Sequence, residues 1–318
     1  MGIQYRAELD GLRAVAVALV VPVHCGVPWF TGGYIGVELF FVLSGYLITA
    51  ILLAEHESTG RIRIGAFYWR RARRLYPALL AMLAAYLALA PILAPEGQHT
   101  RDALVAGLYL SDYAMTFWKV PHYLGHTWSL AVEEHFYLLW PLVLLWMLKG
   151  RTAPWKLTAV LFLLAWLWQR HMANMGAVGF RFDTRATGLV AGCLLAMRPW
   201  TFISARVAGL AGALMLATII ALNDRPTLPF VELAGVLLVI GAQHLRGLAH
   251  PVMVWMGKLS YGIYLWHFPI AMLNPVKMHW LPTLLLVSAA SILLAWLSFV
   301  TIEALFRSER RVLQVAAS

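Results

Sequence analysis

The chain has 318 residues, of which 61% are apolar and only 13% carry a charge. Soluble domains carry about 25% charged residues, and monomers rarely expose an apolar patch as large as this composition would require. The composition therefore excludes an ordinary soluble domain and indicates a membrane protein. The net charge of +10 does not indicate nucleic-acid binding, because the positive residues fall between apolar runs, where they orient a membrane protein.

Apolar runs long enough to cross a bilayer, about 17–25 residues each, recur along the whole chain. They predict an all-α, polytopic bundle of ten transmembrane helices, forming a single membrane-embedded domain over residues 1–318. The more polar stretch at about 100–118 is expected to be an interfacial or re-entrant helix. The predicted spans cover residues 13–29, 34–54, 76–95, 128–148, 157–173, 183–198, 206–222, 228–243, 259–275 and 283–304.

The distribution of Lys and Arg predicts the orientation of the bundle. With the N-terminus inside, eighteen of the 25 Lys and Arg residues lie on the cytoplasmic side and six lie outside, while Arg185 falls within a span. Cytoplasmic loops carry this kind of positive excess, so both termini are expected inside. An eleventh span at 100–118 would move the positive clusters at 149–156 and after residue 304 to the outside, which argues against it.

The first predicted helix contains LDGLRAVAVALVVPVHCG, with Arg13 and His24 eleven residues apart. Eleven residues are about three turns and roughly 16 Å, so the two side chains share a helix face. Arg13 would lie at the cytoplasmic boundary and His24 in the outer half of the membrane. His24 could accept a proton from a hydroxyl nucleophile. Alternatively, it is a packing residue that hydrogen-bonds another helix.

Four arginines, Arg70, Arg71, Arg73 and Arg74, cluster in the cytoplasmic segment IRIGAFYWRRARRLYP. Arginine binds phosphate through two parallel hydrogen bonds, and coenzyme A carries a diphosphate and a 3′-phosphate. The cluster therefore suits acyl-CoA binding. It equally suits the ordinary positive-inside rule or contact with anionic lipid.

Two acidic residues, Glu133 and Glu134, enter a span from outside in HTWSLAVEEHFYLLWP. They could orient a histidine or bind sugar hydroxyls. They could also simply stabilise a helix N-terminus, where negative charge is favourable.

Two further segments carry polar groups in or beside predicted spans, the first of them at an outer helix start. GFRFDTRATGLVAG places Arg181, Asp183 and Arg185 at a helix start, where a local ion pair would also explain them. GKLSYGIYLWHFPI places Ser260, Tyr264 and His267 on one face by i, i+4, i+7 spacing. We interpret these six residues as a possible acceptor or oxyanion site. The two cysteines, Cys25 and Cys193, have no metal-ligand spacing and predict no disulfide framework.

Taken in order, these segments resemble the acyltransferase-3 family of bacterial membrane O-acyltransferases over nearly the whole chain. YRAELDGLRAVAVALVVPVHCG is similar to the family's opening helix, GGYIGVELFFVLSGYLIT to its second-helix signature, and FYWRRARRLYP to its arginine motif. TWSLAVEEHFYLLWP, RFDTRATGLVAG and LSYGIYLWHFPI resemble the later blocks.

The resemblance implies an enzyme of the bacterial inner membrane that uses acyl-CoA from the cytoplasmic side. It implies a hydroxyl acceptor on a glycan or lipid-linked saccharide. His24 matches the catalytic histidine, Arg13 its partner, Arg71 and Arg74 the paired arginines, and Glu133 the acid of the Trp-Ser-Leu block. We expect acetyl-CoA as co-substrate, no permanently bound cofactor, no metal and no nucleic-acid partner. The oligomeric state is left open.

The sequence departs from the family pattern at three places. Glu38 stands where Asp is expected, His135 where Gln is expected, and no proline follows Glu303. We also expect a stand-alone form without an esterase-like periplasmic domain, which weakly disfavours peptidoglycan as the acceptor.

Two functions from different classes remain open at this point. In the favoured hypothesis, His24 acts as general base on the acceptor hydroxyl, Glu133 or Glu134 orients His24 or the acceptor, and Ser260 or Tyr264 stabilises the oxyanion. A route through an acyl-histidine is a variant of this mechanism. In the alternative, ten spans with buried His, Arg and Glu form a proton-coupled transporter, which the arginine cluster and the lack of paired broken helices disfavour.

Overall fold

A computed structural model describes residues 5–30, 33–177, 179–198, 202–222, 228–274 and 279–307. Within these ranges the regular secondary structure is entirely helical, which confirms the all-α prediction. The helices are α1 (Ala7–His24), α2 (Gly33–Thr59), α3 (Ile64–Leu93), α4 (His99–Gly107), α5 (Ser111–Trp118), α6 (Thr127–Lys149), α7 (Pro154–Asn174), α8 (Phe182–Arg185), α9 (Thr187–Met197), α10 (Ala205–Leu222), α11 (Leu228–Gly241), the 3₁₀ turns η1 (Ala242–His244) and η2 (Arg246–Ala249), α12 (Pro251–Met272), α13 (Trp280–Val300) and α14 (Ile302–Arg307).

Five segments of the described chain are long and apolar enough to cross a membrane: α2, α3, α6, α10 and the continuous stretch Trp280–Phe306. A bilayer core needs about 20 consecutive, mostly apolar helical residues, so this is a membrane protein. The other five predicted spans fall on α1, α7, α8 with α9, α11 with η1, and α12. Ten spans with both termini inside remain a prediction.

Three predicted elements differ from the structure. The single helix expected at 100–118 is two helices, α4 and α5, of nine and eight residues, which are each too short to cross a bilayer. They are separated at Tyr109, whose φ of 54° lies in the left-handed region and interrupts the helix. The span predicted at 183–198 breaks at Ala186 into α8 and α9.

The third difference is at α3, which begins at Ile64, twelve residues before the predicted start at 76. The sequence prediction followed the apolar run, whereas the helix extends through the polar segment that precedes it. All four arginines of the cluster therefore lie on one continuous helix.

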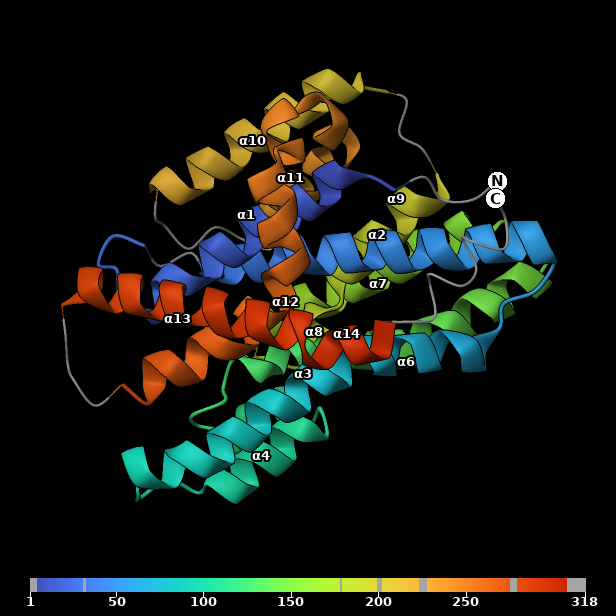
Figure 1. The fold of residues 1–318 in the computed structure, drawn as a ribbon. Helices are drawn as coiled ribbons and strands as arrows, with labels where there is room; N and C mark the ends of the chain where they lie inside the picture. Colours follow the sequence, from blue (N-terminus) through green and yellow to red (C-terminus); the bar gives the residue numbers. More distant parts are fainter. Residues whose placement is uncertain are drawn as a thin grey trace, which may run out of the picture.

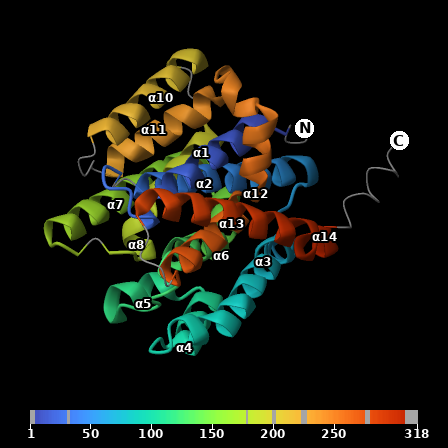
Figure 2. The same cartoon turned by 60° about the vertical axis from the view of Figure 1, so that its left-hand side comes forward.

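The helices surround a central group formed by α1, α2 and α12 (Figure 1). Helix α1 packs against both α2 and α12, α2 packs against α9, and α12 packs against α13. The pair α10 and α11 lies at one end of the molecule and α4 at the opposite end, and the second view agrees (Figure 2). Two of the helices that carry candidate site residues, α1 and α12, thus lie in the middle of the bundle.

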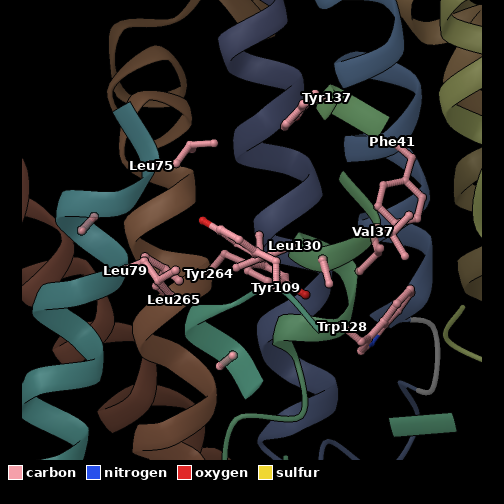
Figure 3. Packing of buried hydrophobic residues seen from close by; sticks show 14 of the residues in the cluster. Val37, Phe41, Leu75, Leu79, Tyr109, Trp128, Leu130, Tyr137, Tyr264 and Leu265 are labelled. Carbon is pink, nitrogen blue, oxygen red and sulfur yellow. The ribbon is translucent and has the colours of Figure 1, made fainter. Parts of the chain in front are cut away.

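Tyr264 of α12 lies in the centre of the buried packing (Figure 3). Leu75 and Leu79 of α3 flank it on one side, and Val37 and Phe41 of α2 on the other. Apolar side chains from two helices, α2 and α3, therefore pack around this part of α12.

Helices α1 and α12 approach each other closely at Gly257. A Cβ atom at this position would lie 1.8 Å from the carbonyl oxygen of Asp10, so only glycine allows the approach. The two helices run in the same direction, because Arg13 contacts Ser260 and, further along both helices, His24 contacts His267. The glycine contact thus brings two pairs of candidate site residues together.

Replacing Gly257 with Ala is therefore expected to destabilise the protein. Overpacking typically costs about 1–3 kcal/mol, so the unfolding temperature of the purified protein in detergent should fall clearly. Gly65→Ala is the matched control, since Gly65 also lies in a helix but faces open space. That substitution should be neutral or stabilising by up to about 1 kcal/mol. Equal unfolding temperatures for the two variants would contradict the close contact.

Candidate active site

A cavity of about 440 Å³ opens between α1, α2, α3, α6 and α12. Ligand sites in proteins typically enclose roughly 300–1,000 Å³. Six of the residues singled out from the sequence line this cavity: Arg13, Arg71, Arg74, Glu133, Ser260 and Tyr264. The structure thus brings together residues that lie far apart in the chain.

Three arginines give the cavity a positive wall. Arg71 and Arg74 lie one turn apart on α3, and Arg71 places its guanidinium carbon 3.7 Å from the centre of the Tyr137 ring. Arg74 is accessible because it faces the open cavity. Arg13 donates from Nε to the Ser260 hydroxyl at 3.3 Å. Stacking and hydrogen bonding hold two of the three guanidinium groups in fixed positions, as recognition of phosphate requires.

Glu133 of α6 faces the same cavity and is held by a short chain of hydroxyl groups. Ser44 of α2 donates to its carboxylate at 2.6 Å, and the Tyr137 hydroxyl donates to Ser44 at 3.0 Å. The sequence-based expectation that Glu133 or Glu134 orients His24 has no counterpart in these contacts. Glu133 instead belongs to the arginine-lined part of the site.

Tyr5, Arg6 and Asp10 line the cavity near the start of α1. Tyr5 donates to the Asp10 carboxylate at 2.5 Å, and Arg6 donates to the Tyr46 hydroxyl at 3.3 Å. Burial, together with the hydrogen bond to Asp10, raises the pKa of Tyr5 to about 12, so its hydroxyl stays neutral at physiological pH. This edge adds an Arg and an Asp to the charged groups around the cavity.

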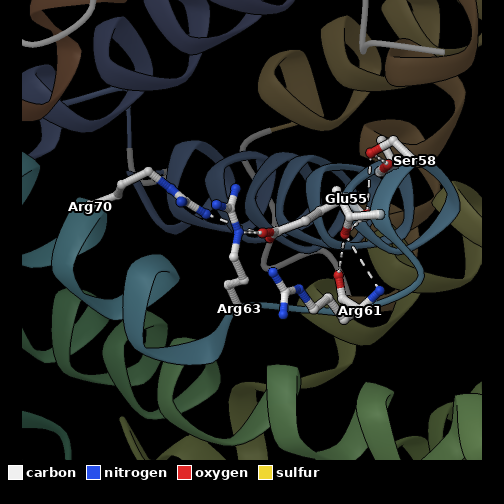
Figure 4. Close-up of polar contacts among 7 residues, drawn as sticks. Glu55, Ser58, Arg61, Arg63 and Arg70 are labelled. Atoms are coloured by element: carbon white, nitrogen blue, oxygen red, sulfur yellow. Dashed lines mark hydrogen bonds and ion pairs between the residues drawn. The ribbon is translucent and has the colours of Figure 1, made fainter.

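Arg70 and Arg73 lie on α3 outside the cavity lining. Arg70 pairs with Glu55 at 3.6 Å, and Arg63 donates to the same carboxylate at 2.8 Å (Figure 4). Arg73 lies over the ring of Trp69, 5.9 Å from its centre. The cluster predicted from the sequence therefore divides into two arginines in the cavity and two at its exterior.

Tyr264 connects the cavity to a group of histidines. Its hydroxyl donates to the His126 carbonyl at 2.9 Å and lies 2.6 Å from the Ser129 hydroxyl. Three residues further along α12, His267 contacts His24 of α1, with 3.1 Å between Nε2 of His267 and Nδ1 of His24. Tyr264 lines the cavity and its ring lies 5.3 Å from that of His267, whereas His24 is not a cavity-lining residue.

Arg181, Asp183 and Arg185 do not line the cavity either. Arg181 and Asp183 form a local ion pair, to which Trp168 adds a hydrogen bond of 2.8 Å. Arg185 pairs at 3.2 Å with Glu38, which is 1% exposed. The local ion pair considered from the sequence is thus present, and Arg185 has a buried structural partner on α2.

Several residues at the site escaped the sequence argument, among them Tyr137, Ser44 and His126. Tyr137 lies four residues after Glu133, so helical spacing would have placed it on the same face. Ser44 lies in an apolar helix with no charged neighbour to mark it, and His126 precedes the helix that carries Glu133. Their roles depend on contacts between helices distant in sequence.

Within the part of the chain that the structure describes, no group of three or more His, Cys, Asp or Glu side chains is arranged to hold a metal ion. Cys25 and Cys193 are both buried and unbridged. The charged side chains that line the cavity are four arginines and two carboxylates, a positive excess that favours an anionic ligand.

The described chain is thus an all-helical membrane protein in which α1, α2, α3, α6 and α12 line one arginine-containing cavity. The model of the family described as "Acyltransferase domain" matches residues 6–302. The chain therefore belongs to the acyltransferase-3 family, as the sequence motifs predicted.

Curated relatives include the Peptidoglycan O-acetyltransferase OatA of Listeria monocytogenes, 34% identical over 94% of this chain and 55% of that protein. The O-acetyltransferase OatA of Staphylococcus aureus is 33% identical over 84% of this chain and 51% of its own length. The Putative peptidoglycan O-acetyltransferase YrhL of Bacillus subtilis is 31% identical over 96% of this chain and 55% of its own. The chain thus spans about half the length of these relatives. No solved structure matches it.

Replacing Arg185 with Leu is expected to destabilise the protein strongly. Removing one partner of a buried ion pair costs about 3–5 kcal/mol, because Glu38 would keep an unpaired charge inside the bundle. Arg70→Leu is the control, since the exposed pair with Glu55 contributes at most about 1 kcal/mol. Thermal unfolding in detergent should separate the two variants, and Glu38→Leu in the Arg185→Leu background should restore part of the loss. Similar stability of the two single variants would contradict a structural role for Arg185.

Proposed function

We propose that this protein is an O-acetyltransferase of the bacterial inner membrane that transfers an acetyl group from acetyl-CoA to a hydroxyl group of a cell-surface or exported glycan. The observation that carries the proposal is that one cavity is lined by Arg13, Arg71, Arg74 and Glu133 together, with Tyr264 also in its lining. The family of the chain and the names of its relatives support the same reaction class.

The donor site is assigned to Arg71 and Arg74. Both guanidinium groups face the cavity from one helix face, where they can bind the diphosphate of coenzyme A bidentately. Even with the negative charge of Glu133 counted, the cavity lining has a positive excess, which favours an anionic ligand. Arg70 and Arg73 lie outside the cavity, where they can contact anionic lipid head groups.

The acyl group would reach His24 along α1. From Arg13 to His24 the helix rises roughly 16 Å, which the extended pantetheine arm would follow past Tyr264. His24 removes the proton from the acceptor hydroxyl, and the oxygen attacks the thioester carbonyl. The carbon–sulfur bond then breaks, and the thiolate of coenzyme A takes the proton back from His24. Atoms and charge balance without a further reactant.

The acceptor is proposed to be a glycan or a lipid-linked saccharide. The relatives from Listeria and Bacillus carry peptidoglycan in their names, so peptidoglycan stays among the acceptors to be tested. Membrane lipid surrounds the bundle and could present a lipid-linked acceptor near the outer end of α1.

We expect His24→Ala to reduce acetyl transfer by about 10²–10⁴-fold, the contribution typical of a general base. The assay measures labelled acetyl incorporated from acetyl-CoA into a cell-surface glycan fraction by membranes with matched protein levels. A folded His24→Ala protein with wild-type incorporation would overturn the catalytic assignment. A proton-coupled transporter would show neither transfer nor acetyl-CoA hydrolysis, so the wild-type protein alone distinguishes the two functions.

Substituting Arg71 or Arg74 with Ala should raise the KM for acetyl-CoA roughly 10- to 100-fold, since a hydrogen bond to a charged group contributes about 1.5–3 kcal/mol. Arg70→Ala is the matched control from the same helix, and its KM should change by less than about fivefold. Initial rates over a range of acetyl-CoA concentrations measure both. Equal effects at Arg70 and Arg74 would place the donor outside the cavity.

A further inference from the structure

The contact between His24 and His267 fixes where the protons of both rings lie. His24 Nδ1 and His267 Nε2 are 3.1 Å apart, and His267 is fully buried. A neutral imidazole carries one N–H group and one bare nitrogen. A hydrogen bond between two neutral rings therefore needs one ring to donate and the other to accept.

His267 must be the acceptor in this pair. Its Nδ1 lies 2.6 Å from the backbone carbonyl oxygen of Tyr264, and a carbonyl can only accept. Turning the ring over would place a carbon atom at this distance, well inside the roughly 3.3 Å of a C–H···O contact. Nδ1 of His267 therefore holds the hydrogen, and its Nε2 is bare.

It follows that His24 donates from Nδ1 to His267. The hydrogen therefore lies on Nδ1 of His24, which leaves Nε2 of neutral His24 with a free electron pair.

We infer that His267 is a positioning residue that holds His24 in the Nδ1–H tautomer, so that Nε2 of His24 is the nitrogen that takes the proton from the acceptor. The tautomer follows from the geometry alone, whereas its catalytic meaning rests on the proposed function. In catalytic histidines, the hydrogen bond made by one ring nitrogen commonly decides which of the two nitrogens carries the proton. The assignment also removes His267 from the possible oxyanion site, because its only N–H group already donates to the backbone carbonyl of Tyr264.

The surroundings of the pair offer no competing partner among the described side chains. The Phe268 ring packs edge-on against His24 and nearly parallel to His126, with ring centres 4.8 Å and 4.9 Å away. The His126 ring lies 5.4 Å from that of His267, and neither of its nitrogens makes a hydrogen bond of normal geometry, although the Leu265 carbonyl is near. His267 thus fills the position that a carboxylate occupies in many catalytic triads.

The first arm of the test compares two variants of His267. The amide oxygen of Gln can still accept from His24, whereas Leu cannot. The rate of acetyl transfer by His267→Gln should stay within about 10-fold of the wild-type rate. His267→Leu should lower the rate by more than about 10-fold, but by no more than the 10²–10⁴-fold loss expected for His24→Ala. His99→Leu is the control, since His99 is also a buried histidine, bonded to Tyr86 and the Ala94 carbonyl at 2.7 Å each.

The second arm reads the tautomer directly. Ring-¹⁵N NMR spectra of histidine-labelled protein in nanodiscs, with the His24 signals assigned by their loss in His24→Gln, should show a protonated Nδ1 and a bare Nε2. A protonated Nε2, or equal activity of the Gln and Leu variants, would overturn the inference. If the wild type transfers no acetyl but shows this tautomer, the proposed function fails while the pairing of the two histidines stands.

Discussion

The organisation of the site depends on the close approach of α1 to α12 at Gly257, where the Asp10 carbonyl occupies the place of a side chain. Because the two helices run parallel from this point, each provides one member of two contacts, Arg13 with Ser260 and His24 with His267. Both the cavity and the histidine pair therefore take residues from these two helices. A change in their spacing would disturb both ends of the site together.

The arginines within the bundle fall into two groups, one held in a buried ion pair and the other facing the cavity. Arg185 and Glu38 neutralise each other in a buried ion pair, so this arginine is committed to holding α2 against the segment that contains α8. Arg71 and Arg74 face an open cavity, in which the carboxylate of Glu133 accepts a hydrogen bond from Ser44. Arginines with accessible guanidinium groups can bind an anionic ligand, whereas an arginine in a closed pair cannot do so without breaking that pair.

Much of this could be predicted from the sequence, for a physical reason. A helix that crosses lipid needs a long apolar run, so each predicted span coincides with at least one helix, and helical spacing placed Arg71 and Arg74 on one face. The break at Ala186 and the division into α4 and α5 could not be predicted, since they depend on packing between distant segments. Nor could the partner of His24, because that contact joins residues 243 positions apart.

We propose that the cavity holds coenzyme A with its phosphates on α3 and its thiol end toward the histidines. The decisive experiment is a cryo-electron microscopy map of the full chain in nanodiscs with coenzyme A. Density is expected for the diphosphate at Arg71 and Arg74 and for the pantetheine arm running toward Tyr264. Coenzyme A bound elsewhere, for example over Arg70 and Glu55, with the cavity occupied by lipid, would contradict it.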